Sequence, residues 1–318
     1  MLDALKFVQG AVARRDFVPA LTHFQIRDGY IRGFNGKIAL CAPIDLDLDA
    51  TPKAAPFIKA IEACRDTVEI SLTPNGRLAI RSGSFKAYID CLEGEEFPNV
   101  EPEGDEVVPD GGLLDALRVL APFTAEDASR PWAQGVLFRG PSAFATNNVV
   151  AIERWLGYDF PVPINVPKDA VQELLRINEE PMRLSVSDSS VTFHFSGGRW
   201  LRTQTHSLEW PDITKVLDVE ASPKPFPNGF FEAIEVLTPF VDSIGRIYFS
   251  EDGMSTSHEK GVGASVAIKG LPEGCFHYGQ LAKLKGVATK IDFSLYPKPC
   301  PFYGDRLRGV IVGMRPNG

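Results

Sequence analysis

Apolar residues recur at helical spacing in three stretches of the chain that resemble one another. Leu114–Phe123 and Phe231–Phe240 share the same order of apolar and charged positions, and Leu2–Val8 is a looser third copy. An apolar residue at every third or fourth position predicts an amphipathic helix in each stretch. A repeat of this length indicates a structural unit that is built three times.

A β-hairpin is predicted after each of these helices. Alternating apolar residues flank Asp28-Gly29 in the first copy, Gly140-Pro141 in the second and Asp252-Gly253 in the third. Asp-Gly between such residues is a strong hairpin signal, because both residues accept the left-handed conformation of tight turns. In the first two copies a second helix follows, opened by Pro52-Lys53 and by Pro167-Lys168, with another hairpin behind it.

The third copy predicts a helix at Gln280–Lys285 and a strand at Ile291–Leu295. Acidic stretches rich in proline and glycine mark the boundaries between the copies. We therefore predict an α+β fold of three tandem domains, each with two helices packed on antiparallel sheets. The predicted domains are residues 1–104, 105–220 and 221–318.

Composition and charge narrow the possible functions. A net charge of −8 over 318 residues argues against a protein that grips nucleic acid over its whole surface, but not against one with basic residues on a single internal face. The five cysteines are scattered, which is typical of reduced thiols in a cytoplasmic protein. No apolar run approaches the roughly 18 residues of a membrane span, and the N-terminus opens on an amphipathic pattern rather than a signal peptide.

No catalytic constellation is visible in the sequence. The histidines lie far apart, and none has a cysteine or acid at metal-ligand spacing: His23, His194, His206, His258 and His277. Gly33–Lys37 lacks the spacing of a phosphate-binding loop, and no nucleophile elbow is present. Asp45, Asp47 and Asp49 alternate with leucines, as on a half-exposed strand. We therefore expect a protein that is not an enzyme and holds no cofactor or metal.

Four ordered segments together resemble the bacterial-type DNA polymerase III beta subunit, the DNA sliding clamp. Leu2–Leu40 is similar to that family's first helix and hairpin, and Ala145–Asn148 stands where the family has Ala-Thr-Asp-Gly. Glu209–Asp212, like Glu96–Asn99, matches its Phe-Pro-Asp/Asn segments, and Gly309–Pro316 resembles its C-terminal segment. Val149-Val150-Ala151 departs from the usual His-Arg-Leu, which favours a divergent, phage-encoded member and leaves the preferred client motif open.

The resemblance implies a head-to-tail homodimeric ring around double-stranded DNA, bound without regard to sequence. Its helices would line the hole, and a DNA polymerase and a clamp loader would bind through short linear motifs. Basic residues near the predicted helices are the expected DNA-facing set: Lys6, Arg14, Arg15, Lys53, Lys59, Arg65, Arg118, Lys168, Arg176, Lys283, Lys285 and Lys290. Ordinary solvated helix faces explain any one of them equally well, and Phe231–Phe240 carries two glutamates and no base.

The resemblance also implies a hydrophobic pocket for partner peptides and a pair of ring-closing edges. The matching pocket positions are Thr146, Asn147, Asn148, Val149, Val216, Leu217, Val312, Met314, Arg315 and Pro316. The matching edge positions are Phe85, Ala87 and Ile89 in the first domain and Val241 and Ile244 in the third. Core packing is the alternative for Phe85, Ile89, Val312 and Met314. A clamp-like interaction protein that does not encircle DNA is the alternative function.

Overall fold

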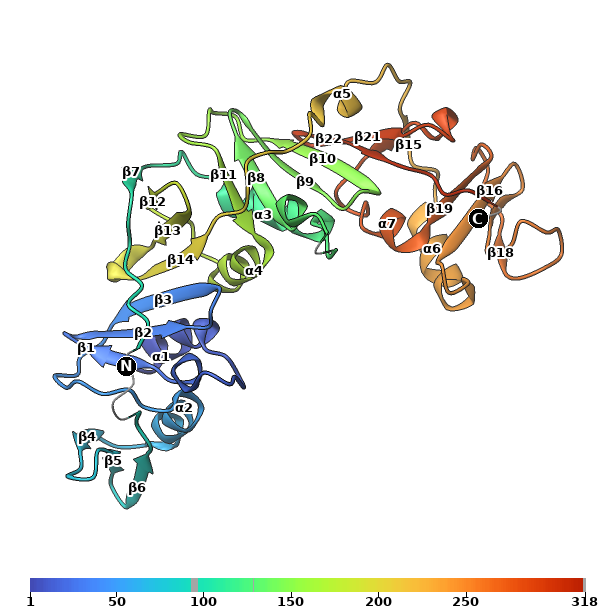
Figure 1. The fold of residues 1–318 in the computed structure, drawn as a ribbon. Coiled ribbons are helices and arrows are strands. Elements are labelled where there is room, and N and C mark those ends of the chain that lie inside the picture. The colour runs from blue at the N-terminus through green and yellow to red at the C-terminus, as the bar shows by residue number, and fades with distance from the viewer. Residues whose placement is uncertain (93–96, 128, 317–318) are drawn as a thin grey trace. The chain divides into compact units, whose positions relative to one another are not determined.

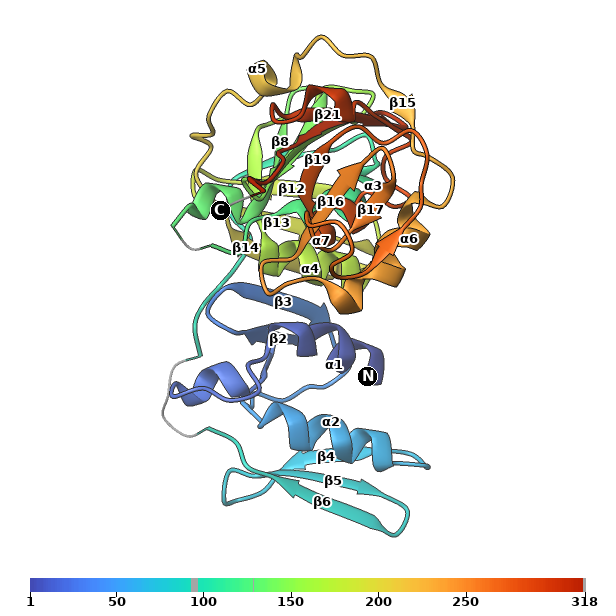
Figure 2. The ribbon, with the colours of Figure 1, turned by 90° about the vertical axis from the view of Figure 1, so that its right-hand side faces the viewer.

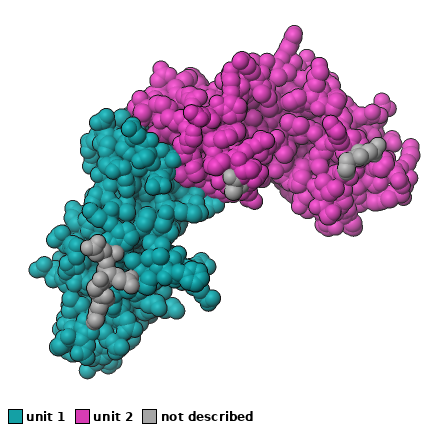
Figure 3. Space-filling model, viewed as in Figure 1, with its two compact units in different colours: residues 1–114, 169–205 teal, residues 115–168, 206–318 magenta. Residues whose placement is uncertain are grey.

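The chain folds into two compact units, which are described separately. The computed structural model describes residues 1–92, 97–127 and 129–316 (Figure 1). Unit 1 comprises residues 1–114 and 169–205, and unit 2 comprises residues 115–168 and 206–318 (Figure 3). Helix α3 (Leu113–Leu120) starts in unit 1 and continues in unit 2, whereas α4 (Lys168–Ile177) starts in unit 2 and continues in unit 1.

Unit 1 holds two antiparallel sheets, one of seven strands in the order β1-β2-β3-β14-β13-β12-β7 and one of three in the order β4-β5-β6. The strands are β1 (Gln25–Arg27), β2 (Tyr30–Phe34), β3 (Ile38–Pro43), β4 (Glu69–Leu72), β5 (Leu78–Ser82), β6 (Phe85–Ile89), β7 (Asp105–Val107), β12 (Arg183–Val186), β13 (Ser190–His194) and β14 (Trp200–Gln204). Helices are α1 (Leu2–Val8), α2 (Ala54–Ala63) and the 3₁₀ turns η1 (Gln9–Ala11), η2 (Pro19–Thr22) and η5 (Ser196–Gly198).

The core of unit 1 forms where its helices meet the sheets. Helix α1 packs on β2, β3 and α2, and its Leu5 and Val8 are fully buried. Phe57 of α2 is also fully buried and meets Phe24 edge to face, with 6.4 Å between the ring centroids. Figure 2 shows α2 between α1 and the sheet β4-β5-β6. The apolar stripe that predicts each helix is thus the side that it buries.

Unit 2 holds an antiparallel sheet of eight strands, β11-β8-β9-β10-β22-β21-β20-β15, and one of four, β18-β17-β16-β19. The strands are β8 (Gly135–Arg139), β9 (Ser142–Thr146), β10 (Val150–Trp155), β11 (Ile164–Pro167), β15 (Lys224–Pro225), β16 (Arg246–Ser250), β17 (Gly253–Ser255), β18 (Ser265–Val266), β19 (Gly274–His277), β20 (Lys290–Ile291), β21 (Cys300–Gly304) and β22 (Leu307–Ile311). Helices are α5 (Thr214–Leu217), α6 (Phe230–Leu237), α7 (Tyr278–Ala282) and the 3₁₀ turns η3 (Ala121–Phe123), η4 (Pro131–Ala133), η6 (Thr238–Phe240) and η7 (Phe293–Leu295).

A cluster of phenylalanine rings forms much of the core of unit 2. The rings of Phe230 and Phe293 stack with centroids 5.5 Å apart, and those of Phe249 and Phe276 lie 5.2 Å apart. All four side chains are buried. Helices α3 and α5 lie on opposite sides of the eight-stranded sheet (Figure 1). The short helix α5 packs against β22.

The predicted hairpins are confirmed. The β1–β2, β8–β9 and β16–β17 pairs all form, and Asp28 and Gly29 adopt φ of 53° and 74° as the first turn requires. Two predictions in the third copy are wrong. The strand covers only Lys290–Ile291, because the Asp292 carboxylate accepts a hydrogen bond from the Ser294 amide and the chain turns into η7. The helix there is α7, which ends at Ala282 instead of continuing to Lys285.

The two large sheets run across the predicted domain boundaries. β3 of the first copy pairs with β14 of the second, from Ile38↔Thr203 to Cys41↔Trp200. β10 of the second copy pairs with β22 of the third, from Val150↔Ile311 to Arg154↔Leu307. Each large sheet is therefore assembled from two sequence copies, and the division into residues 1–104, 105–220 and 221–318 stays a prediction.

Candidate nucleic-acid interface and partner groove

Most of the predicted DNA-facing residues of unit 1 are exposed on its helices or on the turns beside them. Lys6 lies on α1 and Lys59 on α2, while Lys53 immediately precedes α2. Arg14, Arg15 and Arg65 follow the helices in turns. Lys6 Nζ lies 3.2 Å from Glu62 Oε1 and both side chains stay about half exposed, so the positive charge of Lys6 is partly compensated.

Arg176, the seventh predicted basic residue of unit 1, has a structural role. Its Nη2 donates to the Phe7 carbonyl at 2.8 Å, near the C-terminal end of α1. Its Nε donates to Glu173 Oε1 at 2.8 Å, and Glu173 is buried. The guanidinium therefore fastens α4 to α1, where it satisfies a helix-end carbonyl and a buried carboxylate. Only the exposed part of the Arg176 side chain therefore remains available to contact DNA.

In unit 2 two predicted lysines converge on one glutamate. Lys168 Nζ donates to Glu126 Oε1 at 3.0 Å, and this bond lowers the pKa of Glu126. Burial lowers the pKa of Lys283, and the neighbouring positive charge of Lys168 lowers it further while Glu126 opposes the shift. Lys168 binds the Glu126 carboxylate and Lys283 lies within its electrostatic influence, so two positive charges stand near one negative charge beside the start of α4. Arg118 is exposed on α3.

The other two predicted basic residues of unit 2, like Lys283 just after the end of α7, are not on a helix. Lys285 follows α7 in a turn and its Nζ lies 2.6 Å from Glu235 Oε1 of α6. Lys290 lies in β20, paired with Tyr303 of β21. The prediction that a last helix carries these lysines is wrong, since α7 ends early and the chain re-enters the sheet.

Several predicted pocket residues come together at one end of the eight-stranded sheet. The Val312 amide donates to the Val149 carbonyl at 2.8 Å, which extends the β10–β22 pairing by one step. The Asn147 carboxamide accepts from the amides of Val149 and Val150 and so fixes the turn after β9. Asn148 occupies the left-handed position of that turn with φ of 72°. Val312 remains 39% exposed, so an apolar side chain faces solvent beside the turn.

Helix α5 and the segment before it border the same sheet. Val216 is exposed, whereas Leu217 is buried and belongs to the core. Just before α5, a hollow of about 190 Å³ is lined by residues of β8, β9 and the Trp210–Thr214 segment. Leu137, Phe144 and Trp210 among its lining residues were not predicted as pocket residues. The Trp-Pro-Asp segment was the sequence signal that could have located the hollow.

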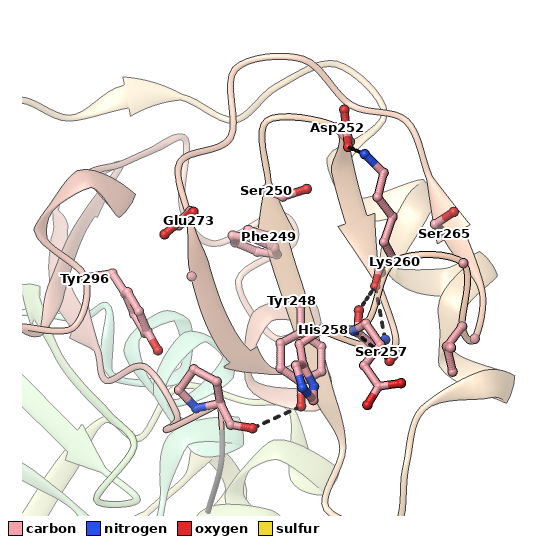
Figure 4. A pocket seen from close by; sticks show the side chains of 17 residues that line it. Tyr248, Phe249, Ser250, Asp252, Ser257, His258, Lys260, Ser265, Glu273 and Tyr296 are labelled. Carbon is pink, nitrogen blue, oxygen red and sulfur yellow. Dashed lines mark hydrogen bonds and ion pairs between the residues drawn. The ribbon is translucent and has the colours of Figure 1, made fainter.

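The last predicted pocket residues lie at the other sheet of unit 2. The Met314 amide donates to the Cys275 carbonyl of β19 at 2.7 Å, and Tyr296 Oη donates to the Met314 carbonyl at 2.7 Å. Pro316 borders a hollow of about 600 Å³ on the four-stranded sheet, and its carbonyl accepts from Tyr248 Oη at 3.4 Å (Figure 4). The predicted set thus spans both sheets: Thr146–Val149 and Val312 lie at the eight-stranded sheet and Met314–Pro316 at the four-stranded one, and the Asn147 carboxamide donates to Gln280 Oε1 of α7, just after β19, at 2.8 Å.

The lining of the larger hollow is mostly polar. Figure 4 shows Tyr248, His258 and Lys260 around it, and Lys260 Nζ lies 3.6 Å from the Asp252 carboxylate. The Tyr248 and His258 rings lie 5.7 Å apart. Within residues 1–92, 97–127 and 129–316, no three histidine, cysteine, aspartate or glutamate side chains lie close enough together to hold a metal ion. Burial raises the pKa of the Cys41 and Cys300 thiols to about 12, which leaves them unreactive.

The two predicted ring-closing segments differ in structure. β6 (Phe85–Ile89) pairs only with β5 among the described residues, so it is an edge strand as expected. The expectation that Val241–Ile244 is a strand is wrong. Asp242 Oδ1 accepts hydrogen bonds from the amides of Ile244, Gly245 and Arg246, and these bonds hold the segment in a turn.

An exposed apolar patch surrounds that turn, and sequence reasoning missed most of it. Val236 on α6, Phe240 in η6 and Ile244 in the turn are 59%, 62% and 48% exposed. They stand at every fourth position, Val236 and Phe240 within the predicted helix Phe231–Phe240 and Ile244 just after it, so helical spacing continued past Pro239 was the signal available. Exposed apolar patches of this kind typically mark interaction sites.

Comparison of the whole chain with solved structures decides the fold. A sliding clamp of Bacillus subtilis matches with a TM-score of 0.82 and 16% identity, over 99% of this chain and 96% of that one. The C. crescentus beta sliding clamp matches with a TM-score of 0.84 and 17% identity, over 99% and 96%. The fold is that of a sliding clamp. The resemblance read from the sequence is thereby confirmed at the level of the fold.

A third match is the Pseudomonas aeruginosa sliding clamp, DNA polymerase III subunit beta, solved bound to griselimycin. It has a TM-score of 0.82 and 17% identity over 99% of this chain and 97% of that one. No protein-family model and no curated protein matches the sequence. The clamp fold is thus retained here on a sequence that differs at most positions. No helix within the described part of the chain is long and apolar enough to cross a membrane.

Proposed function

We propose that this protein is a DNA sliding clamp, a non-catalytic processivity factor that closes head to tail with a second copy around duplex DNA. One observation carries the proposal. Twice within the chain, the strand that follows the first hairpin of one copy pairs with the last strand of the next copy: β3 pairs with β14, and β10 pairs with β22. The copies therefore already use one junction repeatedly.

The same rule leaves one strand of each kind with a single partner among the described residues. β18 follows the first hairpin of the last copy, and β6 is the last strand of the first copy; each pairs on one side only. Joining β18 of one chain to β6 of another repeats the internal junction, and doing so at both ends closes a ring. An unpaired edge is an aggregation liability unless a defined partner covers it.

The exposed patch of Val236, Phe240 and Ile244 supports the same assembly. It belongs to the last copy, beside the sheet that carries the free β18 edge. In the first copy, Lys86 and Tyr88 are exposed on β6. Phe85, Ala87 and Ile89 alternate with them, and the pattern leaves Phe85 and Ala87 half-buried. Of the predicted interface residues in the last copy, Ile244 contributes through the patch rather than through a strand, and Val241 is half-buried beside it.

Exposed and half-buried basic residues are proposed to face the DNA. Lys6 and Lys59 on the helices of unit 1 and the pair Lys168 and Lys283 in unit 2 carry this assignment. Such contacts with phosphates are individually weak, independent of sequence and sensitive to salt. A protein that must slide needs contacts of this kind, because retention comes from the closed ring. Arg176 contributes through the α1–α4 connection.

The turn Thr146–Val149 with Val312, together with α5 and the hollow at Trp210, is proposed to bind short linear motifs of a DNA polymerase and a clamp loader. The exposed side chains of Val216 and Val312 suit an apolar peptide anchor. The polar surroundings of Met314–Pro316 suit flanking residues of the peptide. Val149-Val150 stand after Asn148 where the family has His-Arg. We therefore expect this protein to bind a client motif that differs from the family's motif. This role places the protein in the cytoplasm, with the replication machinery, and needs no cofactor.

Sedimentation equilibrium and retention on DNA test this function. We expect a dimer at micromolar concentration and a complex with nicked circular DNA that survives a high-salt wash but is lost after the circle is linearised. Phe240→Asp should give a monomer that is not retained, while Phe240→Leu should behave as the wild type. A wild-type protein that is a stable monomer, or that leaves circular and linear DNA equally, would instead identify a clamp-like interaction module that does not encircle DNA.

A further inference from the structure

The loop between α1 and the first hairpin holds an aromatic side chain away from the rest of the protein. The Ala13 amide donates to the Leu21 carbonyl at 2.8 Å and closes the base of the loop. At the tip, the Val18 amide donates to Asp16 Oδ1 at 2.9 Å. Phe17 is fully exposed, at 106% of its reference area. The loop is therefore fixed by its own hydrogen bonds, and the Phe17 ring contributes no packing to it.

The second copy shows that the fold does not require this aromatic residue. The Ala125 amide donates to the Ala133 carbonyl at 2.8 Å, which is the same closing bond in the equivalent loop. Ser129 stands at the position of Phe17, and its amide donates to Asp127 Oδ1 at 2.8 Å. The same loop thus closes with a small polar residue, so the exposed ring of Phe17 calls for an explanation outside folding.

The charges of the two loops also differ. The first copy has Arg14 and Arg15 where the second has Glu126 and Asp127. Both arginines are exposed, and neither forms an ion pair with any described residue. In the second copy, Glu126 is bound to Lys168. Only the first loop therefore offers two arginines outside any ion pair of the described residues beside an exposed aromatic ring, with Asp16 as its one acidic residue.

Basic side chains next to an exposed aromatic ring are the components that bind nucleic acid with unpaired bases. Guanidinium groups hold phosphates, and an aromatic ring stacks on a base regardless of its identity. The bases of an intact duplex are already stacked on one another, so a ring at a loop tip finds a free base face only where the duplex ends.

We propose that the Ala13–Leu21 loop binds DNA at unpaired bases next to a duplex, with Phe17 stacked on a base and Arg14 and Arg15 on the flanking phosphates. The proposal deepens the proposed clamp function and rests on it only for bringing DNA to this protein. It adds a preference for the single-strand–duplex junction, which a sequence-independent lining by itself does not supply.

The test uses a primed duplex whose first unpaired base is 2-aminopurine, since stacking on Phe17 quenches its fluorescence. In low salt the full-length wild type should give saturable quenching. Phe17→Ser, the residue of the second copy, should abolish the quenching and weaken binding to the overhang and to single strands by about 5- to 150-fold. Binding to a blunt duplex should stay within about twofold, since phosphate contacts dominate there. Phe17→Trp should retain the quenching.

The double variant Arg14→Ala/Arg15→Ala should weaken binding to all three DNAs and reduce the salt slope for single strands by about 1.4. Equal overhang affinity of wild type and Phe17→Ser, or no saturable quenching by the wild type, would overturn the proposal. The clamp function is judged separately by retention on circular DNA. If the protein is not retained on circular DNA but its quenching still depends on Phe17, only the clamp function is rejected. If it is retained but the quenching does not depend on Phe17, only the junction site is rejected.

Discussion

The connection between α1 and α4 makes a quantitative prediction about Gly10. A Cβ atom at Gly10 would lie 1.9 Å from Glu173 Oε1 and 2.5 Å from Oε2, far inside van der Waals contact. Glu173 is buried and receives hydrogen bonds from Arg176, which also donates to the Phe7 carbonyl. Gly10→Ala must therefore displace the end of the Glu173 side chain, which lengthens or breaks its hydrogen bonds to Arg176.

The cost follows from what the displaced carboxylate loses. Overpacking costs about 1–3 kcal/mol, and a hydrogen bond to a charged partner contributes about 1.5–3 kcal/mol. Alanine in a helical turn returns about 0.5–1 kcal/mol relative to glycine. Arg176 is 44% exposed and can follow the carboxylate part of the way, so the lower end applies. We expect Gly10→Ala to lower the free energy of unfolding by about 1–3 kcal/mol.

A double-mutant cycle separates this mechanism from a general effect of the substitution. In a Glu173→Ala background the obstructing carboxylate is gone, so Gly10→Ala should become neutral or stabilising. Urea denaturation of the four proteins gives the coupling energy, and hydrogen exchange at the α1 amides localises the effect. Costs that simply add, to within about 0.5 kcal/mol, would refute the steric conflict on which the prediction depends.

Three further predictions follow from the two units. Burial, aided by the charge of Arg183, lowers the pKa of His194 below its usual value, so the unfolded chain binds its proton first. Stability should therefore be complete above about pH 6.5 and fall as the pH drops through the lowered pKa, and a denaturation series should show a smaller fall for His194→Gln. Lys168→Ala/Lys283→Ala should weaken binding to blunt duplex DNA and reduce the salt slope by about 1.8, and an unchanged slope in a fluorescence titration would remove both lysines from the interface. Val312→Asp should weaken the binding of a client peptide by at least about tenfold without altering dimer mass; an unaltered calorimetric affinity would place the groove elsewhere.

Local patterns predicted local structure well. Asp28-Gly29 and Asp252-Gly253 produced hairpins because the residues of the turn alone set its conformation. The third copy was harder, since Asp292 ends β20 with a hydrogen bond to the Ser294 amide, a choice that strand alternation does not encode. Asp242 likewise holds the segment Val241–Ile244 in a turn, because its carboxylate accepts hydrogen bonds from three backbone amides.

The candidate site depended more on contacts between distant residues. The β3–β14 and β10–β22 pairings join residues that are far apart in the sequence, so no local pattern points to them. Arg176 was indistinguishable from a solvated helix residue until the Phe7 carbonyl came within reach. The family resemblance located the turn Thr146–Val149 and Val312, whose backbones are joined by the bond from the Val312 amide to the Val149 carbonyl.

The pairing of β3 with β14 and of β10 with β22 bears on how far the sequence can drift. Amide and carbonyl groups make these bonds, and every amino acid other than proline supplies both. Substitutions of outward-facing side chains on these strands therefore leave the strand pairings between copies intact. Mutation can change the surface side chains while main-chain hydrogen bonds keep the copies joined, which accounts for a fold kept at 14–17% identity.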